Sequence, residues 1–161
     1  MTWERRGYFA AVAVLMALAL VGAGCGSSET TAEELPHITK AELIKKGEAI
    51  CDQGNKVINA KFNVWGAKNA KENKIASQKE LNDFTAKVVI PVRKMELRRL
   101  RALGIPHPGA HTYKRILIGM EEGIEEGEKD HASMLAVGED YAFAEPFELS
   151  FNYGLKSCWV E

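Results

Sequence analysis

The sequence predicts an all-α protein, a small up-and-down bundle of about four helices with a kinked second helix, after a signal peptide and a flexible tether. Three observations support this fold class. Apolar residues recur at helical spacing in long segments between residues 39 and 131. Two of these segments begin with a Ser/Thr-x-x-Glu capping box. The connections between them are short, which favours antiparallel neighbours in a bundle.

Residues 1–24 have the three parts of an export signal. Two arginines stand near the start, an uncharged apolar core follows at residues 8–21, and small residues lead to Cys25. The sequence GAGC at 22–25 resembles the lipobox of bacterial lipoproteins, although Gly22 stands where leucine is usual. That resemblance implies cleavage before Cys25 and a lipid on its thiol.

Three alternatives remain open for this N-terminus. The uncharged run of residues 7–28 is long enough to span a bilayer as an uncleaved anchor. Alternatively, the segment is an ordinary secretory signal in which Cys25 is incidental. The paired arginines also leave the export route open between general secretion and the twin-arginine system.

Residues 25–38 form the second part of the chain, a lipidated cysteine followed by a disordered tether. This stretch is polar and has no apolar period, which is typical of disorder. Thirteen coil residues span about 20 Å. We therefore expect the third part, a helical domain at 39–161, to lie close to the outer face of the cell membrane.

The first helix of that domain begins after Thr39, which forms a capping box with Glu42. Apolar and small residues then follow a helical period as far as Trp65, and Cys51 lies on this stripe. Residues 66–74 break the pattern and predict a loop. Trp65, like Trp159, is interpreted as a cover of the core rather than a ligand platform.

The second helix begins after Ser77, whose capping box partner is Glu80, and it ends at Gly104. Pro91 removes one backbone hydrogen bond within it and predicts the kink. Its last turns are basic, where the helix dipole favours positive charge. The residues concerned are Arg93, Lys94, Arg98, Arg99 and Arg101.

The third helix is predicted at about 109–131. Its glycines at 119, 123 and 127 lie four residues apart, which indicates close packing against a neighbour or, alternatively, a weak spot that unwinds. Pro146 then begins a short helix through Tyr153, and Gly154 stops it. The segment after that glycine returns Cys158 to the core.

The cysteines Cys51 and Cys158 are left over if Cys25 carries a lipid. An even pair outside the reducing cytosol favours a disulfide, the alternative being two unpaired buried thiols. Such a bridge would link the first helix to the last few residues.

The charge of the chain argues against one class of partner. Residues 25–161 hold 19 basic and 21 acidic residues, a net charge of −2, which excludes a general nucleic-acid binder. No motif for serine hydrolysis, phosphate binding or zinc proteolysis occurs, so we expect no catalytic residue and no cofactor.

The candidates for a metal site are Glu128 with His131, at the i,i+3 spacing of di-iron bundles, and His107 with His111. The first pair has only one copy of the motif, so we expect a solvated helix end there. Pro108 and Gly109 place His107 outside the helix, so the second pair has a poor geometry for a metal. Five glutamates at 121–128 repel one another at i,i+4. We expect the basic end of the second helix to neutralise them, and a cation such as Ca²⁺ is the alternative partner.

Three stretches resemble a group of small actinobacterial lipoproteins of unknown function. They are an Ala-Ile-Cys element at 49–51, the stretch "LRALGIP" at 100–106, and a Tyr-Gly-x-x-x-Cys tail at 153–158. The resemblance implies a helical domain with a Cys51–Cys158 bridge and a lipid on Cys25, and it implies no activity.

We therefore expect an extracytoplasmic lipoprotein that binds or scaffolds an envelope protein or a small ligand. The alternatives are an envelope enzyme without a recognisable motif and a cation-binding bundle.

Overall fold

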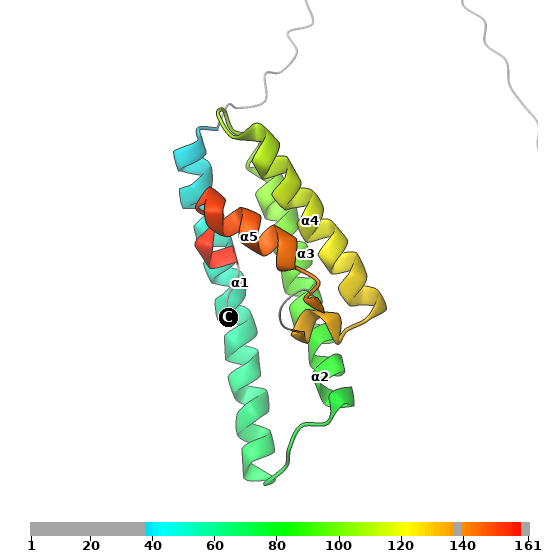
Figure 1. The fold of residues 1–161 in the computed structure, drawn as a ribbon. Helices are drawn as coiled ribbons and strands as arrows, with labels where there is room; N and C mark the ends of the chain where they lie inside the picture. The colour runs from blue at the N-terminus through cyan, green and yellow to red at the C-terminus, as the bar shows by residue number, and fades with distance from the viewer. Residues whose placement is uncertain (1–37, 137–139, 159–161) are drawn as a thin grey trace, which may run out of the picture. The chain divides into compact units, whose positions relative to one another are not determined.

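A computed structural model describes residues 38–136 and 140–158, and all elements in these ranges are helices (Figure 1). The predicted export signal, Cys25, the tether up to residue 37 and Trp159 lie outside the described residues. No helix in the described part of the chain is long and apolar enough to cross a membrane. The elements are α1 (Lys40–Lys71), α2 (Gln78–Phe84), η1 (Thr85–Val89), α3 (Ile90–Ala102), α4 (Ala110–Lys129), η2 (Ser133–Leu135), α5 (Ala144–Tyr153) and η4 (Lys156–Cys158).

The helices form the predicted up-and-down bundle. α1 runs away from the N-terminus, α2 and α3 return beside it, and α4 runs back antiparallel to α3 (Figure 1). The last helix does not run alongside the others as a fourth member of the bundle. Instead, α5 crosses the bundle obliquely and packs mainly on α4. The short η4 turn then brings the end of the chain onto α1.

The helix boundaries follow the predicted caps. At the start of α1, the Glu42 backbone N–H donates to the Thr39 hydroxyl at 3.2 Å, and the Glu42 carboxylate accepts from the Thr39 backbone at 3.2 Å. Ser77 and Glu80 form the same reciprocal pair before α2. Gly104 and Gly154 stop α3 and α5 with φ of 86° and 112°, a conformation that glycine adopts without strain.

The helix that contains Pro91 departs from α geometry one turn before the proline. The five residues of η1 form a π-helical turn, and α3 begins at Ile90. A proline at position 91 cannot donate to the carbonyl four residues earlier, and its ring crowds that carbonyl. A wider turn at this place accommodates both effects, and π turns of this kind accompany bends in helices.

Three predicted boundaries were wrong, and one of them is the start of α5, which lies at Ala144 rather than at Pro146. The loop expected at 66–74 is shorter, because α1 continues through Lys71. Alanine and lysine dominate residues 67–71, and both are strong helix formers. The third helix ends at Lys129 rather than 131, since Asp130 adopts an extended backbone with φ of −133° and ψ of 99°.

The core lies between the first half of α1 and the faces of α3, α4 and α5. Tyr113 is fully buried there, and its hydroxyl donates to the Leu100 carbonyl at 2.8 Å. Burial raises the pKa of Tyr113, as expected for a phenol away from water. The largest other fully buried side chains are Leu43, Leu100, Ile116, Met120, Phe143 and Leu155.

The glycines of α4 form the predicted close-packing seam. A Cβ added at Gly119 would lie 3.0 Å from Pro146, and one at Gly123 would lie 2.6 Å from the Ala142 carbonyl oxygen. At Gly127 it would collide with Met134. The three glycines therefore let η2 and α5 approach α4 closely. The helix is continuous through them, so they form a packing seam rather than a point where α4 unwinds.

Replacement of Gly123 by alanine is expected to lower the free energy of unfolding by about 1–3 kcal/mol, because the added methyl meets a backbone oxygen and the Phe143 ring. Gly66 in α1 is the matched control, since its added Cβ meets nothing within 4 Å. Gly66→Ala should raise the free energy of unfolding by up to about 1 kcal/mol. Urea denaturation measures the free energy of unfolding of both variants. Equal changes would contradict the close packing at Gly123.

Candidate functional site

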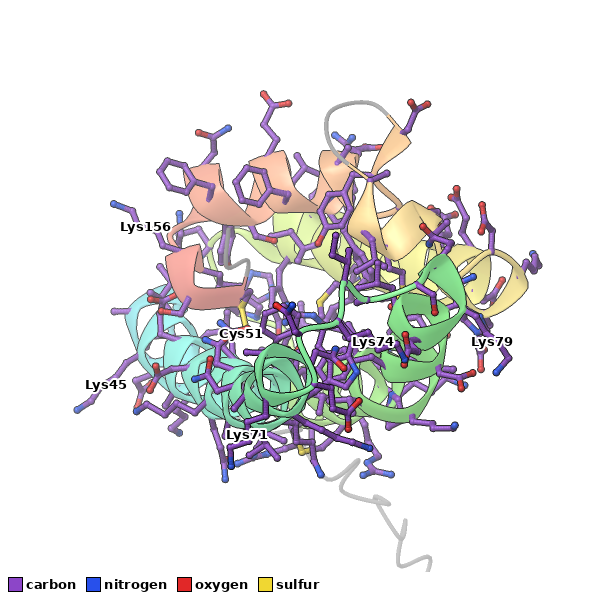
Figure 2. All side chains as sticks on the ribbon, turned by 90° about the horizontal axis from the view of Figure 1, so that it is seen from below. Lys45, Cys51, Lys71, Lys74, Lys79 and Lys156 are labelled. Carbon is purple, nitrogen blue, oxygen red and sulfur yellow. A yellow bond between two sulfur atoms is a disulfide. The ribbon has the colours of Figure 1, made fainter. Side chains whose placement is uncertain are left out.

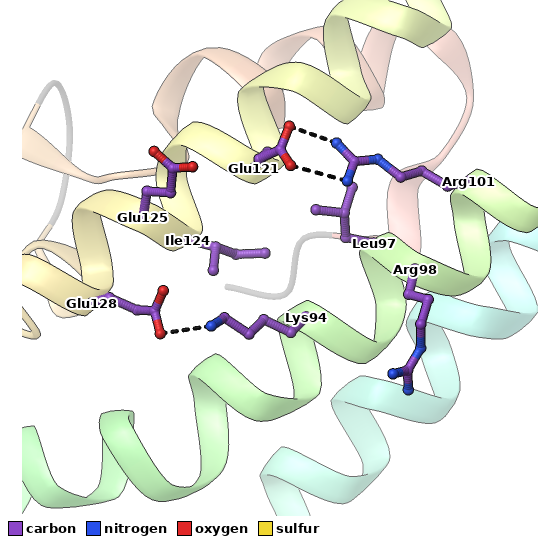
Figure 3. Close-up of a pocket in the computed structure, with 8 residues that line it drawn as sticks. All are labelled: Lys94, Leu97, Arg98, Arg101, Glu121, Ile124, Glu125 and Glu128. Atoms are coloured by element: carbon purple, nitrogen blue, oxygen red, sulfur yellow. Dashed lines mark hydrogen bonds and ion pairs between the residues drawn. The ribbon is translucent and has the colours of Figure 1, made fainter.

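A groove of about 460 Å³ lies between α3 and α4 (Figure 3). Leu97 and Ile124 are its apolar lining residues. Two ion pairs bridge it: Arg101 binds both carboxylate oxygens of Glu121 at 3.0 and 2.6 Å, and Lys94 binds Glu128 at 2.6 Å. Arg98 and Glu125 complete the lining.

These ion pairs confirm the expected neutralisation of the acidic helix by the basic one at Glu121 and Glu128. Hydrogen bonds and the charge of Arg101 lower the pKa of Glu121, and the same contacts raise the pKa of Arg101. All four bridging side chains are about half exposed, so water competes for each pair. The two ion pairs therefore link α3 to α4. Most of the charged side chains that line the groove are paired with each other.

The metal candidates do not come together. Glu128 pairs with Lys94. His131 follows the end of α4, so Glu128 and His131 do not lie on successive turns of one helix. His107 precedes a cis peptide bond to Pro108, outside the helix that holds the exposed His111. In the described ranges, no group of three or more His, Cys, Asp or Glu side chains could hold a metal ion.

A disulfide joins Cys51 in α1 to Cys158 in η4, with an S–S distance of 2.07 Å, as the sequence led us to expect. Both cysteines are buried. Beside the bridge, Glu48 of α1 accepts from the Ser157 backbone at 2.7 Å and from its hydroxyl at 2.8 Å. Ser157 and Cys158 are therefore fixed to α1 by a covalent bond and by hydrogen bonds.

A buried ion pair lies next to this disulfide. Arg93 donates to the Glu96 carboxylate at 2.8 Å and to the Cys158 carbonyl at 3.3 Å, and both side chains are almost completely buried. The second Glu96 oxygen faces Gly54, where a Cβ would collide with it, and it accepts no hydrogen bond. Burial raises the pKa of Glu96 and outweighs the opposing effect of Arg93.

The sequence analysis grouped Arg93 with four other basic residues in the last turns of the second helix. The structure separates it from them, because Arg93 is buried beside Glu96. Two signals were present: Glu96 follows at the i,i+3 spacing of an ion pair, and Gly54 leaves room on the facing helix. Neither signal indicates by itself which face of α3 is buried.

The far end of the bundle carries an aromatic cluster. The rings of Phe62, Trp65 and Phe84 lie with centroids 5.4–5.7 Å apart, where α1 and α2 face each other. Phe62 is 46% exposed, and Trp65 and Phe84 are half-buried. Trp65 lies in this cluster and not against the buried core, contrary to expectation, and it lines a hollow of about 270 Å³ with Phe84 and residues of α2 and η1.

Comparisons with protein-family models, curated protein sequences and solved structures found no match to this chain.

Proposed function

We propose that the protein is a lipid-anchored lipoprotein on the outer face of the cell membrane, where its helical domain acts as a binding module. The buried Cys51–Cys158 disulfide is the observation that carries this proposal. Stable disulfides belong to oxidising compartments outside the cytosol. A chain with such a bridge needs an export signal, and residues 1–24 match one.

The remaining cysteine supports the lipid. Cys25 lies outside the described domain, after an apolar run and small residues that match a lipobox. Two acyl chains hold a protein stably on a bilayer, because each buried methylene contributes about 0.8 kcal/mol. The polar segment that follows would leave the domain close to the bilayer.

Exposed apolar side chains support a binding role over a purely structural one. Val64 of α1 is 74% exposed, and Ile75, in the connection between α1 and α2, is 93% exposed. Apolar surface of this kind gains stability when another surface covers it. Its position at one end of the bundle leaves it accessible to a partner.

Metabolic labelling with radioactive palmitate in a bacterial host tests the anchor. The full chain is expected to take up label and to run as a species shorter than its precursor. Cys25→Ser should remain unlabelled and uncleaved, whereas Cys51→Ser, the matched control, should still carry label. Equal labelling of the wild-type chain and Cys25→Ser would contradict the proposed lipid site.

A further inference from the structure

One exposed face of α1 combines lysines with valines. Its members are separated by 3, 4, 7 or 11 residues or by sums of these, which places them on the same side of a helix. All are exposed, and no acidic residue stands among them. This face, called the basic face below, lies on the second half of α1 and consists of Val57, Lys61, Val64, Lys68 and Lys71.

The lysines at the far end of this face are not neutralised within the domain. Among the described residues, no carboxylate lies within ion-pair distance of Lys61, Lys68 or Lys71. Other lysines nearby do have partners, for example Lys74, which binds Glu80 at 2.5 Å. The three lysines therefore leave positive charge available to something outside the chain.

The domain separates its charges between two sides. α1 contains seven basic and three acidic residues, a net charge of +4. Residues 110–153 contain three basic and ten acidic residues, a net charge of −7. Figure 2 shows Lys45 and Lys71 on the side of the bundle away from α5. An anionic surface would therefore attract the α1 side and repel the opposite one.

The apolar side chains of the same region match the interface of a bilayer. Ile75 projects from the loop after α1 and is 93% exposed, and Val64 is 74% exposed within the basic face. Membrane-surface helices combine lysines with apolar side chains.

We propose that the basic face of α1, together with Ile75, docks on an anionic phospholipid bilayer, so that α1 lies along the membrane. This inference rests on the proposed function, because the tether and lipid keep the domain at that membrane. A helix of this length extends about 48 Å. Electrostatic attraction is screened within about 8–10 Å. An upright α1 would hold Lys68 and Lys71 out of range, whereas a flat one brings every lysine of the face to the lipid.

Vesicle binding by the unacylated mature chain tests the docking. Residues 25–161 with Cys25→Ser keep every residue that the structure describes, so a failure here leaves the lipid on Cys25 unaffected. The chain is expected to sediment with vesicles of phosphatidylglycerol and phosphatidylcholine at low salt. It should dissociate as the salt concentration rises, and it should bind vesicles of phosphatidylcholine alone much more weakly.

Matched lysine variants locate the surface. Lys68→Gln/Lys71→Gln should weaken binding about thirty-fold, since each lysine near an anionic surface contributes about 1 kcal/mol. Lys114→Gln/Lys129→Gln changes the net charge equally on α4, at exposed positions, and should leave binding almost unchanged. Equal weakening by the two variants, or no binding of the parent chain, would overturn the proposal.

Apolar variants distinguish a bilayer from an acidic protein surface. Ile75→Asn should weaken vesicle binding about tenfold, because the side chain enters the interface, whereas Ile118→Asn, at a 52% exposed position of α4, should not. Concentration-dependent self-association that Lys68→Gln/Lys71→Gln abolishes, without any vesicle binding, would overturn the proposal in favour of a second copy of this chain.

Discussion

Reduction of the Cys51–Cys158 disulfide is expected to lower the free energy of unfolding by up to about 4.7 kcal/mol. The two cysteines are 107 residues apart, so the bridge removes many conformations from the unfolded chain. It also fixes η4 on α1, and with it the Cys158 carbonyl that accepts from Arg93. Loss of the bridge should therefore loosen the end of the chain and uncover the buried ion pair.

Thermal and urea denaturation of the mature chain, with and without reductant, measure this effect. The double variant Cys51→Ala/Cys158→Ala should unfold near the reduced midpoint and should not respond to reductant. Cys25→Ser should behave as the parent chain, because that cysteine is outside the bridge. Identical midpoints for oxidised and reduced protein would show that the bridge is absent or does not stabilise the fold.

Replacement of Arg93 by methionine is expected to cost about 3–5 kcal/mol of the free energy of unfolding. Methionine keeps most of the side-chain volume but leaves the Glu96 carboxylate buried without its cation. A buried charge without a partner is one of the few single changes with effects of this size. Arg98→Met, at an exposed position of the same helix, should change stability by less than about 0.5 kcal/mol.

The double variant Arg93→Met/Glu96→Gln distinguishes lost charge pairing from lost packing. It should be more stable than Arg93→Met alone, because no uncompensated charge remains inside. Urea denaturation of the four proteins in this cycle gives the coupling free energy. A double variant that is less stable than the single one would contradict the account of this site.

The free energy of unfolding should depend on pH in part because of Glu96. Because burial raises its pKa in the folded state above the ordinary value of 4.5, the folded chain binds a proton that the unfolded chain has released. Its contribution to stability is therefore complete below about pH 4.5 and declines as the pH rises toward the folded pKa. The free energy of unfolding of the wild-type chain minus that of Glu96→Gln should fall over that interval. A rise would contradict the raised pKa of Glu96.

Local signals in the sequence predicted most of the fold. Each capping box involves residues three apart, and each terminating glycine acts on its own turn, so neither depends on distant parts of the chain. The glycine row of α4 and the pairing of α3 with α4 also followed, because spacing and charge limit the arrangement of neighbouring helices. These are the features on which the predicted bundle and the observed one agree.

The remaining features depend on contacts between distant segments. The burial of Arg93 and Glu96 depends on Gly54 of α1 and on the carbonyl of Cys158, which no local pattern connects. The aromatic cluster joins Phe62 and Trp65 of α1 to Phe84 of α2, and no local pattern sets a contact between these two helices. The basic face of α1 becomes visible only when the buried side of that helix is known.

The intact mass of the protein purified from membranes of its native host tests the lipid anchor. We expect a chain that begins at Cys25 and carries a diacylglyceryl group on that residue. A chain that still begins at Met1, or a mature chain with an unmodified Cys25, would contradict the lipid anchor on which the proposed function and the docking of α1 rest.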